Sequence, residues 1–265
     1  MKPDPFSLLL HRRSAGHGPV ILMYHSIQAG DRVPAWPWAV SFRRFRAQLD
    51  WLAEAGYATP TVSELVAQPA RYGARTAVIT FDDGYEDNLA AWEELTRRGM
   101  KATWYVTTGY LGQAHPWRDE RRPQGRLLAP GELRAMAESG MEIGSHTVTH
   151  PRLPELGNAS IEKELAESKA MLEDMLGRQV TSFAYPYGAW DERCEAFVKL
   201  AGYASACLTR TGWALRDNDP FRLRRLTVFN TDNLGRFVRK LAWASHDVSW
   251  PHVARYALSR IAARM

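Results

Sequence analysis

Residues 76–85 read TAVITFDDGY. The first six are apolar or β-branched, which is typical of a buried strand, and two adjacent carboxylates, Asp82 and Asp83, follow at its end. Gly84 permits a sharp turn that exposes both carboxylates. A helical pattern then runs over 88–98 and stops at a glycine, so this stretch predicts a strand–loop–helix unit with polar chemistry in the loop.

The same alternation continues along the whole chain. Six further short apolar runs are strand candidates, at 20–27, 102–108, 141–145, 182–187, 204–209 and 223–229. Further helical patterns occur at 41–55, 129–139, 160–176 and 191–202. Seven strands alternating with helices predict an α/β protein, a parallel barrel that is complete or distorted. The active site of such a barrel lies at the C-terminal ends of its strands.

The bulk composition is that of an ordinary globular protein. The chain has 265 residues, of which 45% are hydrophobic and 24% charged. Cys194 and Cys207 form no disulfide framework and lack zinc-finger spacing, so we expect two inert thiols. We divide the chain into an N-terminal extension (1–19), a barrel (20–232) and basic amphipathic helices (233–265).

Positive charge is concentrated at the C-terminal end. From residue 210 onward there are eleven Arg and Lys against four Asp, a net of +7, which leaves about −2 of the total +5 for the rest. The pattern at 234–244 puts its cations and Trp243 on one side of a helix, and a less regular pattern follows at 252–265. Such helices suit an anionic membrane surface, or they cover the barrel with a solvated basic face.

The N-terminus shows no apolar stretch long enough for a secretory signal, and no run approaches the length of a membrane span. We therefore expect a cytoplasmic protein, with peripheral contact at the inner membrane face as a further hypothesis. Nucleic-acid binding is not favoured, because no nucleic-acid-binding motif accompanies the basic end.

Two histidines, His146 and His150, follow the strand predicted at 141–145. A spacing of four would bring them together on one helical turn, where a single metal ion could bridge them. Two histidines and one carboxylate are a recurrent ligand set that leaves positions open for water and substrate. Asp83 could complete this set, and Asp82 would remain free as a base.

Two more strand ends carry candidate residues, each open to two interpretations. Tyr187 follows the strand at 182–187 between Pro186 and Gly188, either as a packed aromatic in a turn or with its N–H aimed at an oxyanion. His25 ends the first strand, either as a structural histidine or as a group at the barrel mouth. The irregular segment at 109–128 is expected to form a flap over that mouth.

Taken together and in this order, these motifs resemble the polysaccharide deacetylases (NodB-type, carbohydrate esterase family 4). The resemblance covers about 20–229 and rests mainly on the motifs at 80–85 and 146–150. It implies a distorted (β/α)7 barrel and hydrolysis of N-acyl groups on amino sugars. It also implies one divalent metal, usually Zn²⁺, with Co²⁺ or Ni²⁺ as alternatives. The implied ligands are Asp83, His146 and His150.

The resemblance also implies roles for other residues. Asp82 corresponds to the general base, and the N–H of Tyr187 would help to hold the oxyanion. The family often has an arginine in its third motif, where this chain has Ala184, and Arg225 is the candidate replacement. A late Leu-x-His motif, which often supplies the acid, is absent. The Tyr24-His25 start is similar to the branch with poly-N-acetylglucosamine deacetylases, so His25 is the candidate acid.

The predicted function is therefore metal-dependent removal of an N-acyl group, N-acetyl by preference, from a sugar in a polysaccharide, oligosaccharide or lipid-linked glycan. The alternative is a non-catalytic carbohydrate-binding protein on the same fold. The residues expected at the metal and base positions are all present, which argues against that alternative. The sequence leaves the sugar and the acyl group open.

Overall fold

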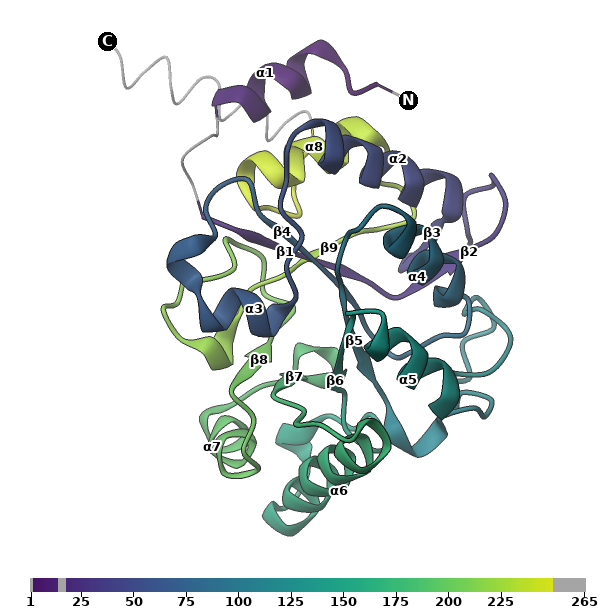
Figure 1. Cartoon of the computed structure of the whole chain (residues 1–265), viewed down its shortest axis with the longest axis vertical. Coiled ribbons are helices and arrows are strands. Elements are labelled where there is room, and N and C mark those ends of the chain that lie inside the picture. Colours follow the sequence, from purple (N-terminus) through teal and green to yellow (C-terminus); the bar gives the residue numbers. More distant parts are fainter. Residues whose placement is uncertain (1, 14–17, 250–265) are drawn as a thin grey trace.

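The computed structural model describes residues 2–13 and 18–249. Its centre is a parallel seven-stranded sheet in the order β8-β7-β6-β5-β4-β1-β9 (Figure 1). The strands of this sheet are β1 (Val20–Tyr24), β4 (Ala77–Phe81), β5 (Thr103–Val106), β6 (Glu142–Ser145), β7 (Ser182–Ala184), β8 (Ser205–Cys207) and β9 (Leu226–Thr227). A second, two-stranded parallel sheet is formed by β2 (Ser26–Gln28) and β3 (Ala39–Ser41).

The segment that leads into β9 closes the curled sheet. Leu223 forms a parallel bridge with Cys207 of β8, and its carbonyl accepts a hydrogen bond from the N–H of Leu208 (2.8 Å). Three residues later, Leu226 pairs with Leu22 of β1. One short segment therefore contacts both edges of the sheet, and the predicted distorted (β/α)7 barrel is confirmed.

Helices surround the sheet on its outer side (Figure 1). They are α2 (Phe42–Glu54), α4 (Asn88–Arg97), α5 (Pro130–Glu138), α6 (Asn158–Leu176) and α7 (Glu192–Leu200), all close to their predicted bounds. Short 3-10 turns occur at η1 (Pro69–Arg71), η2 (Thr108–Tyr110), η3 (Leu153–Glu155), η4 (Pro186–Gly188) and η5 (Pro220–Arg222). Helix α3 (Val62–Ala67) was not predicted; it packs Val62 and Leu65 into the interior of the barrel.

Strand β4 shows how the fold aims side chains into the barrel mouth. Ile79 and Phe81 belong to the core between sheet and helices, where Phe81 stacks on Trp104 with ring centroids 4.6 Å apart. Val78 belongs to the smaller core inside the barrel. Because side chains alternate along a strand, Asp82 continues the inner series that starts at Val78. The strand thus delivers a carboxylate to the mouth.

The prediction of a solvated cationic face at 234–244 is wrong for two of its residues, which are buried. In helix α8 (Leu234–Trp243), Arg239 and Lys240 are only 4% and 1% exposed. Arg239 donates a hydrogen bond to Ser7 Oγ (2.7 Å), and Lys240 forms an ion pair with Asp232. Buried charges require such partners, and these lie at positions that a helical wheel does not consider.

The two ends of the described chain meet on one side of the barrel. Helix α1 (Pro5–Arg13) lies beside α8 in Figure 1 and packs against it. The second basic pattern, at 252–265, lies outside the described residues. Among the helices of 2–13 and 18–249, none is long and apolar enough to cross a membrane.

Candidate metal centre and active site

The loop after β4 turns two consecutive carboxylates into the same cavity. Asp83 adopts a left-handed backbone conformation (φ 72°), and Gly84 follows with φ 87°. Side chains of adjacent residues in a strand would point to opposite faces, so the reversal at Asp83 is what brings both into the mouth. A left-handed aspartate is uncommon and costs backbone energy, which is a feature of functional sites.

The loop after β6 places the two histidines together without a helical turn. Thr147 (φ 68°) and His150 (φ 62°) are both left-handed, and the N–H of His150 donates to the Thr147 hydroxyl (2.9 Å). Glu164 of α6 accepts hydrogen bonds from the N–H groups at 148 and 149. The rings of His146 and His150 are 4.7 Å apart. The expected contact therefore forms, but the expected helical geometry was wrong.

Asp83, His146 and His150 form a buried cluster whose ligand atoms lie within 4.8 Å of one another. Asp83 Oδ1 is 3.3 Å from His150 Nε2 and 3.8 Å from His146 Nε2. His146 Nδ1 donates to the carbonyl of Ala184 (2.7 Å), which leaves Nε2 as an acceptor facing the cluster. One carboxylate and two imidazole nitrogens fit a divalent cation such as Zn²⁺.

Electrostatics favour the ligand forms of the cluster. Burial lowers the pKa of His150 to about 3, although Asp83 opposes this shift. Burial would raise the pKa of Asp83, but electrostatic interaction with the surrounding imidazoles, first that of His150, and with Arg122 brings it down to about 2. A neutral imidazole and an ionised carboxylate are the protonation states that bind a metal.

Asp82 is held by a fully buried arginine. Arg225 Nη1 donates to Asp82 Oδ1 (2.6 Å) and Nη2 donates to Oδ2 (2.7 Å). Arg225 Nε is fixed by the carbonyl of Leu208 (2.9 Å). Burial would raise the pKa of Asp82, but the Arg225 guanidinium keeps it below its ordinary value. Arg225 thus lies where an arginine would orient the base, although Ala184 occupies the expected position in the sequence.

His25 and Tyr187 border the same cavity. His25 packs edge-on against Trp36 (5.7 Å), and its buried Nδ1 has no partner among the described residues. Burial lowers the pKa of His25, while the two aspartates act in the opposite direction. Tyr187 has a left-handed backbone (φ 60°), and its ring lies 4.5 Å from that of His150.

These residues surround a cleft of about 410 Å³ at the C-terminal ends of the strands. Its lining residues are Met23, His25, Trp36, Trp38, Asp82, Asp83, Arg122, His146, His150, Arg152, Tyr187, Thr209 and Thr227. The structure therefore brings six of the seven predicted site residues to one cavity. Arg225, the seventh, lies beneath it and contacts Asp82.

Arg122 and the tryptophans of this cleft were not predicted. Arg122 lies in the segment expected as a flap, and it reaches Asp83 Oδ2 at 3.2 Å. Trp117 of the same segment packs edge-on against His150 (5.2 Å). The segment thus does lie at the mouth. No spacing in the sequence signals these contacts, because the segment is irregular.

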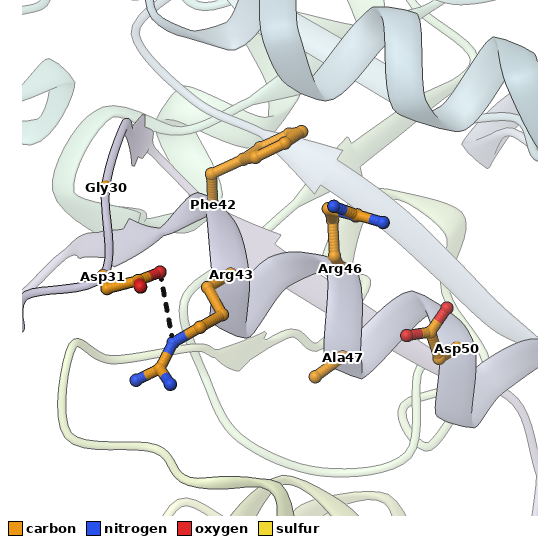
Figure 2. Close-up of a pocket in the computed structure, with 7 residues that line it drawn as sticks. All are labelled: Gly30, Asp31, Phe42, Arg43, Arg46, Ala47 and Asp50. Carbon is orange, nitrogen blue, oxygen red and sulfur yellow. Dashed lines mark ion pairs between the residues drawn. The ribbon is translucent and has the colours of Figure 1, made fainter. Parts of the chain in front are cut away.

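A second cavity, of about 490 Å³, lies on the outer side of α2 (Figure 2). Its charged side chains neutralise one another or their neighbours. Arg43 pairs with Asp31 (3.3 Å, dashed in Figure 2), and Arg46 pairs with Glu94 (3.3 Å). It contains none of the predicted site residues, so the cleft at the strand ends is the candidate active site.

The chain is similar in sequence to known proteins of one family. The family model for polysaccharide deacetylase matches residues 70–206. YxkH of Bacillus subtilis, named as a candidate polysaccharide deacetylase, is 33% identical over 214 residues, which cover 78% of this chain and 70% of YxkH. The poly-β-1,6-N-acetyl-D-glucosamine N-deacetylase of Staphylococcus aureus is 25% identical over 177 residues, 62% of this chain and 59% of that protein.

Solved structures show the same fold. A candidate polysaccharide deacetylase from Bacillus anthracis superposes with a TM-score of 0.71 at 26% identity, over 85% of this chain and 69% of that one. IcaB from Ammonifex degensii gives a TM-score of 0.69 at 24% identity, over 87% and 98% of the two chains. The chain belongs to the polysaccharide deacetylase family.

Proposed function

We propose that this protein is a metal-dependent hydrolase that removes an N-acetyl group from an amino sugar of a glycan. Its family supports deacetylation of carbohydrate, and the metal dependence and the sugar are the parts that we add. The observation that carries the proposal is the ligand cluster of Asp83, His146 and His150 beside an ionised Asp82.

The ligand cluster suits the difficult part of the reaction. An amide is a poor electrophile, and its amine is a poor leaving group. A divalent cation, when held by Asp83, His146 and His150, would polarise the carbonyl and make water more acidic. Zn²⁺ is the preferred candidate, since two imidazoles and one carboxylate form a common catalytic zinc set.

Asp82 is proposed as the base. It lies next to the ligand cluster, with His146 Nε2 4.0 Å from its Oδ2. As the carbon–oxygen bond to the attacking water forms, Asp82 takes a proton of that water. Arg225 holds both carboxylate oxygens in one orientation, so the remaining lone pairs of Asp82 point in a fixed direction.

Tyr187 and His25 are proposed to stabilise the tetrahedral species and to protonate the leaving amine, respectively. The N–H of Tyr187 stabilises the negative oxygen of the tetrahedral species, which is why a strained backbone would be retained there. The carbon–nitrogen bond then breaks, and the nitrogen takes a proton from His25. The products are acetate and the amine of the sugar. Burial keeps His25 neutral at rest, so it must gain a proton before it can donate one.

N-acetylglucosamine glycans are the first substrates to test. Two relatives are named for such substrates, the poly-β-1,6-N-acetyl-D-glucosamine deacetylase of Staphylococcus aureus and a chitooligosaccharide deacetylase of Sinorhizobium fredii, which is 27% identical over 150 residues. The screen should therefore contain β-1,6- and β-1,4-linked oligomers, together with free and lipid-linked N-acyl sugars.

The deciding experiment measures amine release by mass spectrometry, with Zn²⁺ and after treatment with a chelator. Asp82→Asn should keep bound metal and lose most turnover, since a positioned base contributes roughly 100- to 10,000-fold. Asp119→Asn is the matched control, because Asp119 is a partly exposed aspartate (32%) that pairs with Arg121 and does not line the cleft. Unchanged activity in Asp82→Asn would remove the base from the proposal, and unchanged activity without metal would remove the cation.

A further inference from the structure

Arg122 is inserted into the mouth by the segment between η2 and α5. Its guanidinium carbon lies 4.6 Å from the ring centroid of Trp36 and 4.5 Å from that of Trp117. Only 14% of the side chain is exposed. A guanidinium this close to two indole rings is attracted to both by cation–π interaction. The position of this cation is therefore built into the fold.

The guanidinium of Arg122 donates its hydrogen bond to one particular oxygen of Asp83. Arg122 Nη1 donates to Asp83 Oδ2 (3.2 Å) and also to the hydroxyl of Tyr85. The other oxygen, Oδ1, is the one that approaches the imidazole nitrogens, at 3.3 Å from His150 Nε2. The two oxygens of one carboxylate thus have separate partners.

The segment that carries Arg122 is fixed to the loop that carries Asp83. The N–H of Leu128 donates to the carbonyl of Gly84 (2.8 Å), and the N–H of Glu86 donates to the carbonyl of Arg126 (3.1 Å). These bonds flank the antiparallel bridge between Tyr85 and Leu127, which follows Asp83 and Arg122 closely in the sequence. The arginine and the carboxylate therefore keep their register through the backbone.

We propose that Arg122 is a positioning residue that reserves Oδ2 of Asp83, so that Asp83 offers the cation a single oxygen. A carboxylate can bind a metal through one oxygen or through both. Binding through both would occupy a position that water or the acyl carbonyl requires at a catalytic site. Hydrogen bonds to the outer oxygen of a ligand commonly fix this choice. The inference rests on the metal site of the proposed function.

Metal affinity alone would test this role poorly. The charge of Arg122 repels a cation, whereas its hydrogen bond orients a ligand of that cation, so the two effects on affinity oppose each other. Coordination number is the discriminating property. Co²⁺ reports it directly, because Co²⁺ with four ligands absorbs visible light more strongly than Co²⁺ with five or six.

The experiment compares the visible spectra of the full-length protein loaded with Co²⁺. Arg122→Met keeps an unbranched apolar stem but removes the donor, and Arg122→Gln keeps a donor but withdraws it by two atoms. Both should show weaker absorption and a lower kcat. Arg122→Lys restores part of the absorption, since it keeps a charged donor without the planar stack. Arg121→Met is the control, because Arg121 is 59% exposed and pairs with Asp119.

Thermal unfolding of the metal-free variants establishes that they are folded. If Arg122→Met is unfolded, Arg122→Gln is used in its place. A wild-type spectrum in the folded Met or Gln variant would overturn the role of Arg122. That role would also be overturned if Arg121→Met changed the spectrum as much as the Arg122 variants do. Failure of the wild-type protein to bind Co²⁺ or Zn²⁺ would instead count against the proposed function, so the two failures are distinguishable.

Discussion

Removing Arg225 should destabilise the protein far more than removing its neighbour Arg224. Both arginines hold an aspartate through two hydrogen bonds, at 2.6 and 2.7 Å for Asp82 and at 2.7 and 2.8 Å for Asp217. The pairs differ in burial. The side chains of Arg225 and Asp82 are 0% and 3% exposed, against 20% and 27% for Arg224 and Asp217.

The expected magnitudes follow from that difference. Arg225→Met leaves Asp82 as an unpaired buried charge, which costs about 3 to 5 kcal/mol. In a chain of this size that loss lowers Tm by roughly 6 to 20 °C. Arg224→Met breaks a pair that water can solvate, and it should cost at most about 1 kcal/mol.

Urea unfolding of the metal-free protein measures both losses, and equal m-values in all variants would validate the comparison. The double variant Asp82→Asn/Arg225→Met provides the test of cause. It should be more stable than Arg225→Met alone, because no lone charge remains in the barrel. The reasoning is refuted if Arg225→Met costs no more than Arg224→Met, or if the double variant shows no recovery.

Three further outcomes are expected. His150→Ala should lose stoichiometric Zn²⁺, measured by metal analysis after dialysis, since only two ligands would remain; full retention of metal would contradict the ligand assignment. His25→Ala should lower kcat while the metal content stays at the wild-type level, and loss of metal would show that His25 is not purely an acid. Burial, with Arg75 nearby, lowers the pKa of His11 from 6.5 to about 4. As the pH falls, His11 is therefore protonated first in the unfolded chain. The contribution of neutral His11 to the free energy of unfolding is complete above about pH 6.5 and is lost as the pH falls through 4. Urea unfolding at pH 7.5 and 4.5 should show a smaller pH effect in His11→Gln, and an unchanged effect would contradict this account.

The pattern of the sequence predicts the barrel well because each unit is locally determined. Helix α2 begins and ends within one residue of the pattern at 41–55, and α4 does the same for 88–98. Strand lengths are predicted less well. The apolar run at 223–229 contains only two paired residues of β9, because the preceding residues turn away to meet β8. Pairing partners, rather than local composition, decide where such a strand begins.

For the C-terminal helix α8, the sequence pattern predicts the helix but not which of its charged side chains are exposed. A helical wheel predicts a basic face, yet Lys240 is buried against Asp232, and Arg239 reaches α1 at the other end of the chain. One partner of Arg239, Ser7, is more than 200 residues away in sequence. Long-range pairs of this kind leave no periodic signal, so a pattern of charges does not reveal which of them are solvated.

The absence of a sequence signal for long-range contacts also explains why Arg225 could be suggested but Arg122 was missed. Arg225 lies at the start of the strand candidate at 223–229 and directly precedes β9, where a side chain can face the barrel interior. Arg122 belongs to an irregular segment, and its contact with Asp83 depends on two tryptophans, one from the same segment and one from the loop between β2 and β3. An arginine of a strand can be placed from topology, whereas an arginine of a loop requires the assembled structure.

Backbone strain was also beyond the reach of sequence patterns, and it connects the site with the fold. Among the described residues, six non-glycine residues have left-handed φ values, and four of them lie in the loops that form this site: Asp83, Thr147, His150 and Tyr187. Each comes shortly after the end of a parallel strand. The strand directs the chain out of the barrel, so a residue beyond the strand end can be turned back toward the mouth when the chain reverses at once. Glycine would make that reversal without strain, but it carries no carboxylate, imidazole or ring. The strain is thus the consequence of placing chemistry at the point where the backbone must turn, and the rigid hydrogen-bonded strands on either side are what sustain it.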